Sequence, residues 1–369
     1  MVNFIKNSDD EYTPRELVKH AFEHKETPRI PFSFGLGINY PVKSDLLEYL
    51  RFTDMQQLDD YLIRYEDFRQ LHVPYIGPSD KFCSLPDGSY VDAWGVKRSP
   101  INYSENGTYH EISYYPMAGI KNVSQLDDFA WPHPDWFDYS AVPEILKEIN
   151  PDGQYAVKLG NGNVFETSWY MRGLEQMMID FIDDPDLVYA IFERVTDFYI
   201  TYFDRTLRAA NGQVDVVFTA DDIAGQRGLM FSPQLWKEQL VPWHKKLNER
   251  LHEHGVKIMY HTDGAAHSVI EDMIKMGIDA WEAVQMDADG MDARKIKKAA
   301  AGRLAIHGGI SVQQLLPFGT PDEVRSEISY LIKVFSTGGG YIPAPAHAIQ
   351  AGTPPENVIA MLDTVRPDL

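Results

Sequence analysis

The chain has 369 residues, of which 44% are hydrophobic, enough to bury the core of one large α/β domain. Its 34 basic and 54 acidic residues give a net charge of −20, which repels nucleic-acid backbones and anionic membrane surfaces. Neither is therefore expected as a partner. The starting run MVNFIKNSDDEYTPREL lacks the apolar core of a signal peptide, and no apolar run reaches the roughly 20 residues that span a bilayer. Cys83 is the single cysteine, so no disulfide can form within the chain, as is typical of a reducing compartment. These features predict a cytoplasmic protein.

Short apolar runs that end in polar residues alternate with longer amphipathic stretches, a pattern typical of βα units that build a parallel sheet. In chain order, the predicted strands are 29–36, a weaker run at 72–76, then 155–161, 214–222, 256–263, 278–285, 303–309 and 340–347. Amphipathic stretches at 183–210, 232–254 and 321–336 are predicted helices, and Ser232 and Thr320 each place a capping hydroxyl before a proline. Eight parallel strands close a (β/α)8 TIM barrel, which is the predicted fold class.

A barrel needs about 250 residues, and the surplus falls mostly within 38–150. This stretch has turn signals at 86–88 and 105–107, β-favouring runs around 89–115 and many aromatic residues. We therefore predict a single barrel domain over 1–369, with an aromatic-rich β-hairpin insertion at about 38–150 that packs over one end of the barrel. Most of the aromatic side chains in it are expected to fill a small core of its own.

Polar residues at the strand ends are the candidates for chemistry, because the active site of such a barrel lies at the carboxyl ends of its strands. They are Asn161, Asp221, Asp222, His261, Asp263, Glu282, Gln285, His307 and His347. Residues two apart on a strand point to the same side, so His261 and Asp263 can present an imidazole and a carboxylate to one ion, with His347 across the barrel mouth. This nitrogen-and-oxygen set predicts a site for zinc, or for another divalent metal, with one position left open.

Each of these residues also has an ordinary alternative, since a single histidine or aspartate at a strand end is more often a hydrogen-bonding group. Glu282 is a candidate fourth ligand or a base for a bound water. Asp221 and Asp222 are adjacent on the predicted strand and point oppositely, so only one should face the mouth. Asp222 is favoured as that residue, orienting a substrate together with Gln226. The two aspartates could instead form a general acid/base pair or hold neighbouring loops in place. The glycine-rich segments 308–309 and 337–340 lack a complete phosphate-binding fingerprint, which argues against nucleotide binding.

Four motifs of the sequence resemble the uroporphyrinogen decarboxylase superfamily: DDIAGQRGLMFSPQLWKEQLVPW, YHTDGAAHSVIEDMIKMGIDAWEAVQ, LAIHGGISVQQLLPFGTPDEVRSEI and GGGYIPAPAHAIQAGTPPENVIAM. The resemblance covers most of the chain from about 155 to 366. The decarboxylase itself carries an arginine-rich W-x-M-R-Q-A-G-R motif near its start that grips substrate carboxylates, and this chain has RIPFSFGLGINYP instead. The resemblance therefore favours the superfamily's zinc-dependent methyltransferases, which move a methyl group between a small substrate, or coenzyme M, and a corrinoid protein.

Matched motif to motif, the zinc-binding H-x-C pair and later cysteine of those methyltransferases fall on His261, Asp263 and His347. The resemblance thus implies a harder metal site in which both cysteines are replaced, a corrinoid carried by a partner protein, and the demethylase branch that acts on methoxylated compounds. In that reading Asp222 and Glu282 are catalytic, and the substrate-binding residues are Asn161, Gln285, His307, Trp94 and Tyr103. The metal would act as a Lewis acid on the substrate's ether oxygen or amine.

Two other functions stay open from the sequence. One is a metal-independent decarboxylase of a small or tetrapyrrole carboxylic acid, with Asp222 as the central residue and Arg172 and Arg227 in lesser roles. The other is a non-catalytic barrel that binds a ligand or a corrinoid, against which the ionisable groups at the strand ends count. A homodimer is also an open alternative.

Overall fold

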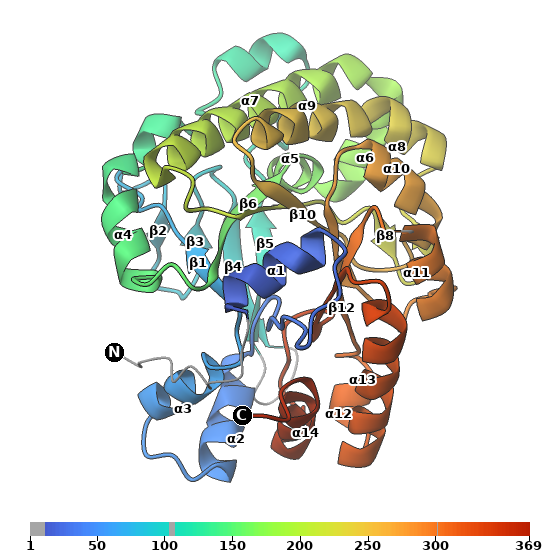
Figure 1. Ribbon diagram of the computed structural model, residues 1–369. Coiled ribbons are helices and arrows are strands. Elements are labelled where there is room, and N and C mark those ends of the chain that lie inside the picture. The colour runs from blue at the N-terminus through green and yellow to red at the C-terminus, as the bar shows by residue number, and fades with distance from the viewer. Residues whose placement is uncertain (1–11, 103–107, 301) are drawn as a thin grey trace.

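The structure is a computed structural model that describes residues 12–102, 108–300 and 302–369. Its main sheet is a curled parallel sheet in the order β1-β6-β7-β10-β11-β12-β13, surrounded by helices (Figure 1). The strands are β1 (Phe68–Leu71), β6 (Ala156–Asn163), β7 (Val216–Ala220), β10 (Lys257–His261), β11 (Ala280–Val284), β12 (Ala305–Ile310) and β13 (Tyr341–Pro345). This TIM-barrel-like α/β fold confirms the predicted class, and six of the eight predicted strands match within a few residues.

The gap between β13 and β1, which we call the seam, is spanned by segment 30–34. Ser33 N–H donates to the carbonyl of Pro343 in β13 at 3.3 Å, and the carbonyl of Phe32 accepts from Asp67 N–H at 3.1 Å, just before β1. Backbone hydrogen bonds thus run from one edge of the sheet to the other through this segment, which takes the place of the eighth strand.

Two of the expected strands are wrong in detail. Segment 29–36 contains no regular strand, because the N–H groups of Phe32 and Phe34 donate to side-chain carboxylates at 2.7 Å rather than to a neighbouring strand. The strand predicted at 72–76 is replaced by β1, which ends at Leu71, just before that range. Proline at position 74 has no N–H to donate to a ladder, which fits the end of pairing before it.

Helices cover the outside of the barrel. They are α1 (Pro14–Phe22), α2 (Tyr40–Tyr49), α3 (Met55–Leu62), α4 (Val142–Ile149), α5 (Phe165–Arg172), α6 (Leu174–Asp183), α7 (Pro185–Ala210), α8 (Pro233–Gln239), α9 (Val241–His252), α10 (Ile270–Lys275), α11 (Ala293–Ala300), α12 (Leu315–Phe318), α13 (Pro321–Ser336) and α14 (Pro355–Val365), with short 3-10 helices η1 (Val123–Asp127), η2 (Pro134–Trp136), η3 (Tyr139–Ala141) and η4 (His267–Val269). The predicted caps are confirmed, since Ser232 Oγ accepts from Leu235 N–H at 3.1 Å and Thr320 Oγ1 accepts from Glu323 N–H at 3.3 Å. The stretch predicted as one helix at 232–254 is divided into α8 and α9.

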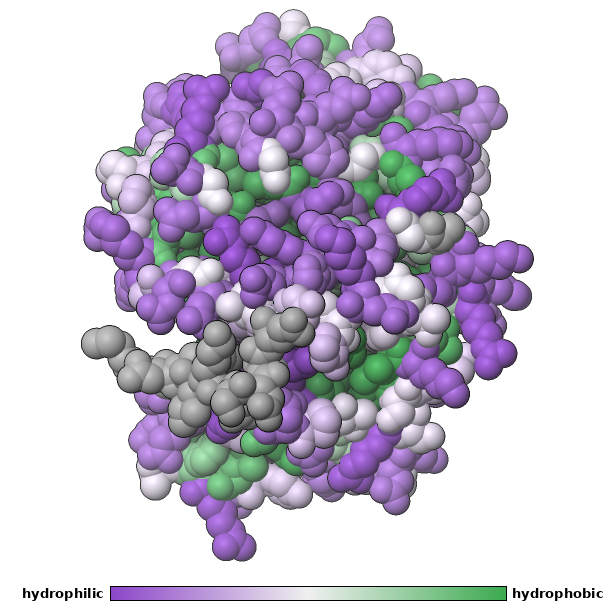
Figure 2. Space-filling view, viewed as in Figure 1, coloured by the Kyte–Doolittle hydropathy of each residue, from purple (hydrophilic) through white to green (hydrophobic). Residues whose placement is uncertain are grey.

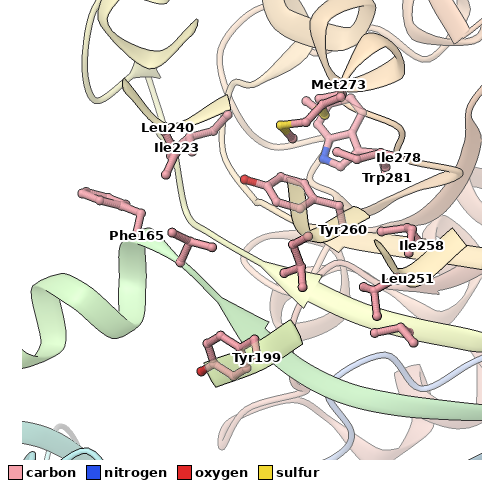
Figure 3. Close-up of a cluster of buried hydrophobic side chains, with 14 of the residues drawn as sticks. Phe165, Tyr199, Ile223, Leu240, Leu251, Ile258, Tyr260, Met273, Ile278 and Trp281 are labelled. Carbon is pink, nitrogen blue, oxygen red and sulfur yellow. The ribbon is translucent and has the colours of Figure 1, made fainter. Parts of the chain in front are cut away.

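Hydrophobic side chains fill the space on both sides of the strands. Outward-facing residues such as Tyr260 and Trp281 pack against Leu251 and Met273 of the outer helices, as Figure 3 shows. Inside the barrel, Phe22 and its neighbours on α1 pack against the first inward-facing residues of the strands. Helix α1 lies across the ring of strands in Figure 1 and covers their amino ends. Among the described residues, α1 thus closes the amino end of the barrel and leaves the carboxyl ends for an opening.

An antiparallel sheet, in the order β2-β3-β4-β5, lies between β1 and β6 in the chain. Its strands are β2 (Cys83–Ser84), β3 (Tyr90–Val91), β4 (Lys97–Asn102) and β5 (Thr108–Tyr114). They confirm the predicted hairpins. The guanidinium of Arg98 lies 4.4 Å from the ring centroid of Tyr170 in α5, so the sheet sits beside the carboxyl end of β6. Because β1 also falls within 38–150, the limits of the insertion and the single-domain division stay predictions.

The helices of residues 12–102, 108–300 and 302–369 include none with the length and apolar character needed to cross a membrane. The face seen in Figure 2 is mostly hydrophilic, with smaller hydrophobic areas between the polar side chains. A small two-stranded hairpin of β8 (Ala224–Gly225) and β9 (Gly228–Leu229) completes the loop that follows β7.

Candidate active site

Strand alternation fills the barrel interior with an apolar layer and then a polar one. The apolar layer, next to α1, includes Phe68, Ala156, Met259, Ala280 and Ala305. Two residues further along the same strands come Gln70, Lys158, His261, Glu282 and His307, which we call the polar layer. The interior therefore changes from apolar to ionisable toward the carboxyl ends, where a barrel enzyme places its chemistry.

The centre of the polar layer is a hydrogen bond between His261 and Glu282, which are direct neighbours on β10 and β11. Nδ1–H of His261 donates to Glu282 Oε2, and His307 Nδ1 lies 3.8 Å from Glu282 Oε1. Burial opposes the charge of Glu282, but the charge and hydrogen bond of His261 outweigh it and lower its pKa to about 2. Burial likewise opposes the charge of His261, yet Glu282 raises the pKa of that ring to about 10. Burial lowers the pKa of His307 to about 4, so His307 is neutral at pH 7.

Three carboxyl groups lie on the mouth side of His261. Its Nε2 atom is 3.5 Å from Asp222 Oδ1, and the side chain of Asp222 is 41% exposed. Burial and the charge of Asp222 raise the pKa of Asp263 to about 6. Burial and the same aspartate raise the pKa of Glu166 to about 7. Crowded carboxyl groups of this kind favour a bound cation or a retained proton.

Asp221 and Asp222 follow the end of β7 and make different contacts. The fully buried carboxylate of Asp221 accepts from the N–H groups of Phe165 at 2.9 Å and Glu166 at 2.7 Å, and it pairs with His244 Nε2. It therefore caps the first turn of α5. Asp222 is left as the member of the pair that faces the mouth.

Glu166 is a site residue that strand-end reasoning missed. Its carboxyl accepts from Asn163 Nδ2 at 2.6 Å and from the hydroxyl of Tyr170 at 2.6 Å. It lies in the first turn of α5, directly after β6, and is buried. Acidic residues in the loop or first helical turn after a barrel strand are the signal that could have found it, since these positions also border the mouth.

The donor chemistry around His261 fits a divalent metal. Glu282 fixes the ring through Nδ1, the usual second partner of a metal-ligating histidine, and leaves Nε2 facing the carboxyl groups, where a metal would displace the proton that the raised pKa keeps on the metal-free ring. Nδ1 of His347 is buried and makes no hydrogen bond to the described part of the protein, and burial lowers its pKa, so the ring is neutral. The described residues contain no three His, Cys, Asp or Glu side chains already gathered as a metal site. Ligation by His261, Asp263 and His347 would therefore need side-chain movement.

Of the remaining residues predicted to bind substrate, Gln285 and Trp94 make contacts within the protein. Gln285 is buried and links loops: its amide exchanges hydrogen bonds with Gln226 at 3.1 and 3.2 Å, and it accepts from Gly264 N–H at 2.9 Å. Trp94 packs on Phe198 of α7, with ring centroids 4.8 Å apart. These contacts account for both side chains without a substrate. Tyr103 lies outside the described residues, whereas Asn161 borders a cavity.

That cavity has a volume of about 630 Å³ and opens beside the polar layer. Its wall includes Phe34, Glu66, Phe68, Lys158, Asn161 and Phe218. Its size and its mixture of aromatic and polar walls suit a small organic molecule. Lys158 is a second residue missed in the sequence, because it lies within a strand and not at its end. The repeated pattern of alanine followed two residues later by an ionisable residue, in AVK, AWE and AIH, is the signal that could have found it.

A parallel barrel that is closed at its amino end and carries ionisable groups beside a cavity at its carboxyl end has the organisation of a barrel enzyme. The family described as uroporphyrinogen decarboxylase (URO-D) matches residues 121–367, and the chain belongs to this family. The match confirms the resemblance seen in the motifs.

Relatives in this family are distant. Uroporphyrinogen decarboxylase of Neisseria gonorrhoeae is 23% identical over 244 residues, 62% of either chain, so this chain spans about three fifths of that relative's length. Uroporphyrinogen decarboxylase of Pseudoalteromonas translucida is 24% identical over 271 residues, 68% of either chain. In structure the chain is similar to a methyltransferase from Methanosarcina mazei, with a TM-score of 0.67 and 18% identity over 97% of this chain and 99% of that one. This last likeness establishes the fold alone.

Proposed function

We propose that this protein is a metal-dependent methyltransferase that moves a methyl group from a small substrate, such as a methoxylated compound, to the corrinoid of a partner protein. The observation that carries the proposal is the His261–Glu282 hydrogen bond, which turns His261 Nε2 toward Asp222 and the mouth. A carboxylate bound to the second nitrogen is the arrangement that orients a histidine for a metal. The name of the Methanosarcina mazei neighbour agrees with this function.

Zinc would be held by His261, Asp263 and His347, and it would polarise the substrate oxygen that carries the methyl group. Glu282 keeps the ring of His261 oriented, and Asp222 is exposed enough to contact and orient the substrate. Loss of the methyl group leaves a negative oxygen on the substrate. Glu166, whose pKa is raised to about 7, can hold the proton that neutralises it.

The test is elemental analysis of the purified protein beside His347→Ala, with His267→Ala as the matched control because His267 is exposed on the surface. We expect near-stoichiometric zinc in the wild type and the control, and a loss of most of the metal in His347→Ala. Methyl transfer should stop after chelation and return with zinc. A wild-type protein that takes up no divalent metal would contradict the proposal.

A decarboxylase is the second candidate, and the observation that favours it is the name of both sequence relatives. In this case Asp222 would act on a substrate carboxylic acid without a metal. Carbon dioxide release from uroporphyrinogen, unchanged by a chelator and lost in Asp222→Asn, would support this function over methyl transfer.

A further inference from the structure

The cavity beside the polar layer has an aromatic wall and one amine that points to a ligand class. Rings of Phe34, Phe68 and Phe218 line it together with Lys158. The ammonium nitrogen of Lys158 lies 5.2 Å from the ring centroid of Phe218 and 5.8 Å from that of Phe68. The charge thus sits against two aromatic rings, a favourable but non-directional contact that leaves its N–H groups available.

The hydrogen-bonding capacity of Lys158 is unused in the protein itself. No side-chain or backbone acceptor of residues 12–102, 108–300 or 302–369 makes a hydrogen bond or an ion pair with its ammonium group. An ammonium group carries three donors and is costly to leave without acceptors away from bulk water. Lys158 therefore needs either water or a ligand.

The acidic groups that attract the charge of Lys158 are bonded to other partners and do not bond to its ammonium group. Glu66 accepts from the backbone N–H groups of Phe34 at 2.7 Å and Phe68 at 3.2 Å, one at each carboxyl oxygen. Oε2 of Glu282 is paired with His261, whereas its Oε1 is buried and has no hydrogen-bond partner among the described residues. Both carboxylates stabilise the charge on Lys158 from a distance, and neither takes its protons. The donors are left for a group that enters the cavity.

The ring of Phe218 lies near both this amine and His261. Its ring centroid lies 6.0 Å from that of His261, while the ammonium of Lys158 lies 5.2 Å from the same ring. A molecule anchored at Lys158 and packed on Phe218 would therefore extend toward His261. That is the direction in which the reacting end of a substrate must point.

We propose that Lys158 binds the carboxylate of a small aromatic substrate whose ring packs between Phe34, Phe68 and Phe218. The proposal rests on the proposed function only for the reaction at the other end of the molecule. Binding of the carboxylate itself requires neither the metal nor the corrinoid partner, so the two proposals can fail separately.

Calorimetric titration of the full chain with benzoate and with benzamide, its uncharged analogue of the same shape, tests the proposal. The variant is Lys158→Met, which keeps the length of the side chain and removes the charge. The matched control is Lys295→Met, on the exposed face of α11. We expect benzoate to bind the wild type and the control, and to bind Lys158→Met at least about tenfold more weakly, as loss of one charge-assisted hydrogen bond implies.

Benzamide binding should be weaker than benzoate binding in the wild type and should fall less than benzoate binding in Lys158→Met, because its carbonyl can lose a hydrogen bond but carries no charge; remaining benzamide binding also shows that the variant keeps its cavity. Equal benzoate affinity in the wild type and Lys158→Met, equal affinity for the two compounds, or no benzoate binding at all would overturn the proposal. Zinc uptake that persists in such a case would leave the proposed methyltransferase function intact.

Discussion

At the scale of single residues, Glu166 makes the stability of the fold depend on pH. Its pKa is raised by burial and by Asp222 from 4.5 to about 7, so the folded protein holds this proton more tightly than the unfolded chain. Stability from the neutral carboxyl is complete below pH 4.5 and is lost as the pH rises through about 7. The loss amounts to about 3 kcal/mol. Glu166→Gln, which cannot ionise, should escape it.

Denaturant unfolding at pH 5 and pH 8 measures this difference. The free energy of unfolding should fall more steeply between the two pH values in the wild type than in Glu166→Gln. Glu144→Gln, on the surface of α4, serves as the control and should follow the wild type. Parallel pH curves for the wild type and Glu166→Gln would show that Glu166 ionises normally.

Glu282 is the residue that should control the protonation of His261. Without its charge and hydrogen bond, burial acts against the imidazolium form. We expect Glu282→Gln to lower the pKa of His261 by about 1 to 3 pH units, the usual effect of one close opposite charge. Histidine NMR of the metal-free protein measures this pKa directly. The resonance of exposed His267 provides an internal control, and a His261 pKa that stays the same in the variant would exclude this coupling.

The residues of the candidate site were only partly predictable. The alternation rule and the strand-end rule together led to His261, Asp263, Glu282 and His307, because both rules depend on local geometry that the sequence carries. The use of Gln285 in linking two loops depends on a contact with Gln226, 59 positions away, and no local pattern shows it. A residue such as Gln285, whose role lies in a distant contact, can be recognised only when its three-dimensional neighbour is known.

At the scale of elements, the first predicted strand shows why boundaries were harder to predict. Segment 29–36 has the apolar character of a buried strand, and its backbone does bridge the seam. Its hydrogen bonds, however, go partly to the side chains of Glu66 and Asp67. Sequence patterns report which side chains are apolar, whereas regular strand pairing depends on which acceptors lie opposite the N–H groups. The central strands were predictable because their partners are other regular strands.

Asp221 should determine whether the first turn of α5 forms. Its buried carboxylate accepts two backbone N–H groups of that turn and pairs with His244. Asp221→Asn removes the charge and leaves donors without an acceptor, so we expect a loss of about 3 to 5 kcal/mol in the free energy of unfolding. Denaturant unfolding gives this value.

The matched control is Asp322→Asn in the first turn of α13, where the carboxylate is exposed and pairs with Arg325 within the same helix. We expect it to change the free energy of unfolding by less than about 1 kcal/mol. Similar losses in the two variants would mean that Asp221 contributes no more than a surface cap.

At the scale of the whole molecule, the barrel is closed by residues from three distant parts of the chain. Arg366, just after α14, donates to the carboxylate of Asp67 and, at 2.8 Å, to the carbonyl of Ile30. The same carboxylate accepts from Phe32 N–H at 2.7 Å. Because both charged groups are buried, this network links the seam, β1 and the end of α14 without help from solvent.

Removal of one partner from this network should weaken the fold as a whole. In Arg366→Met, the buried Asp67 keeps Arg29, 3.5 Å away, but loses its hydrogen-bonded cationic partner, so we expect the free energy of unfolding to fall by about 3 kcal/mol. Arg303→Met breaks an exposed pair with Glu271 and should change the free energy of unfolding little, since exposed ion pairs are screened by solvent. Hydrogen exchange should be faster across the seam in Arg366→Met and unchanged there in Arg303→Met. Equal stability of the two variants would mean that closure of the barrel depends on backbone pairing and core packing, and not on the buried ion pair.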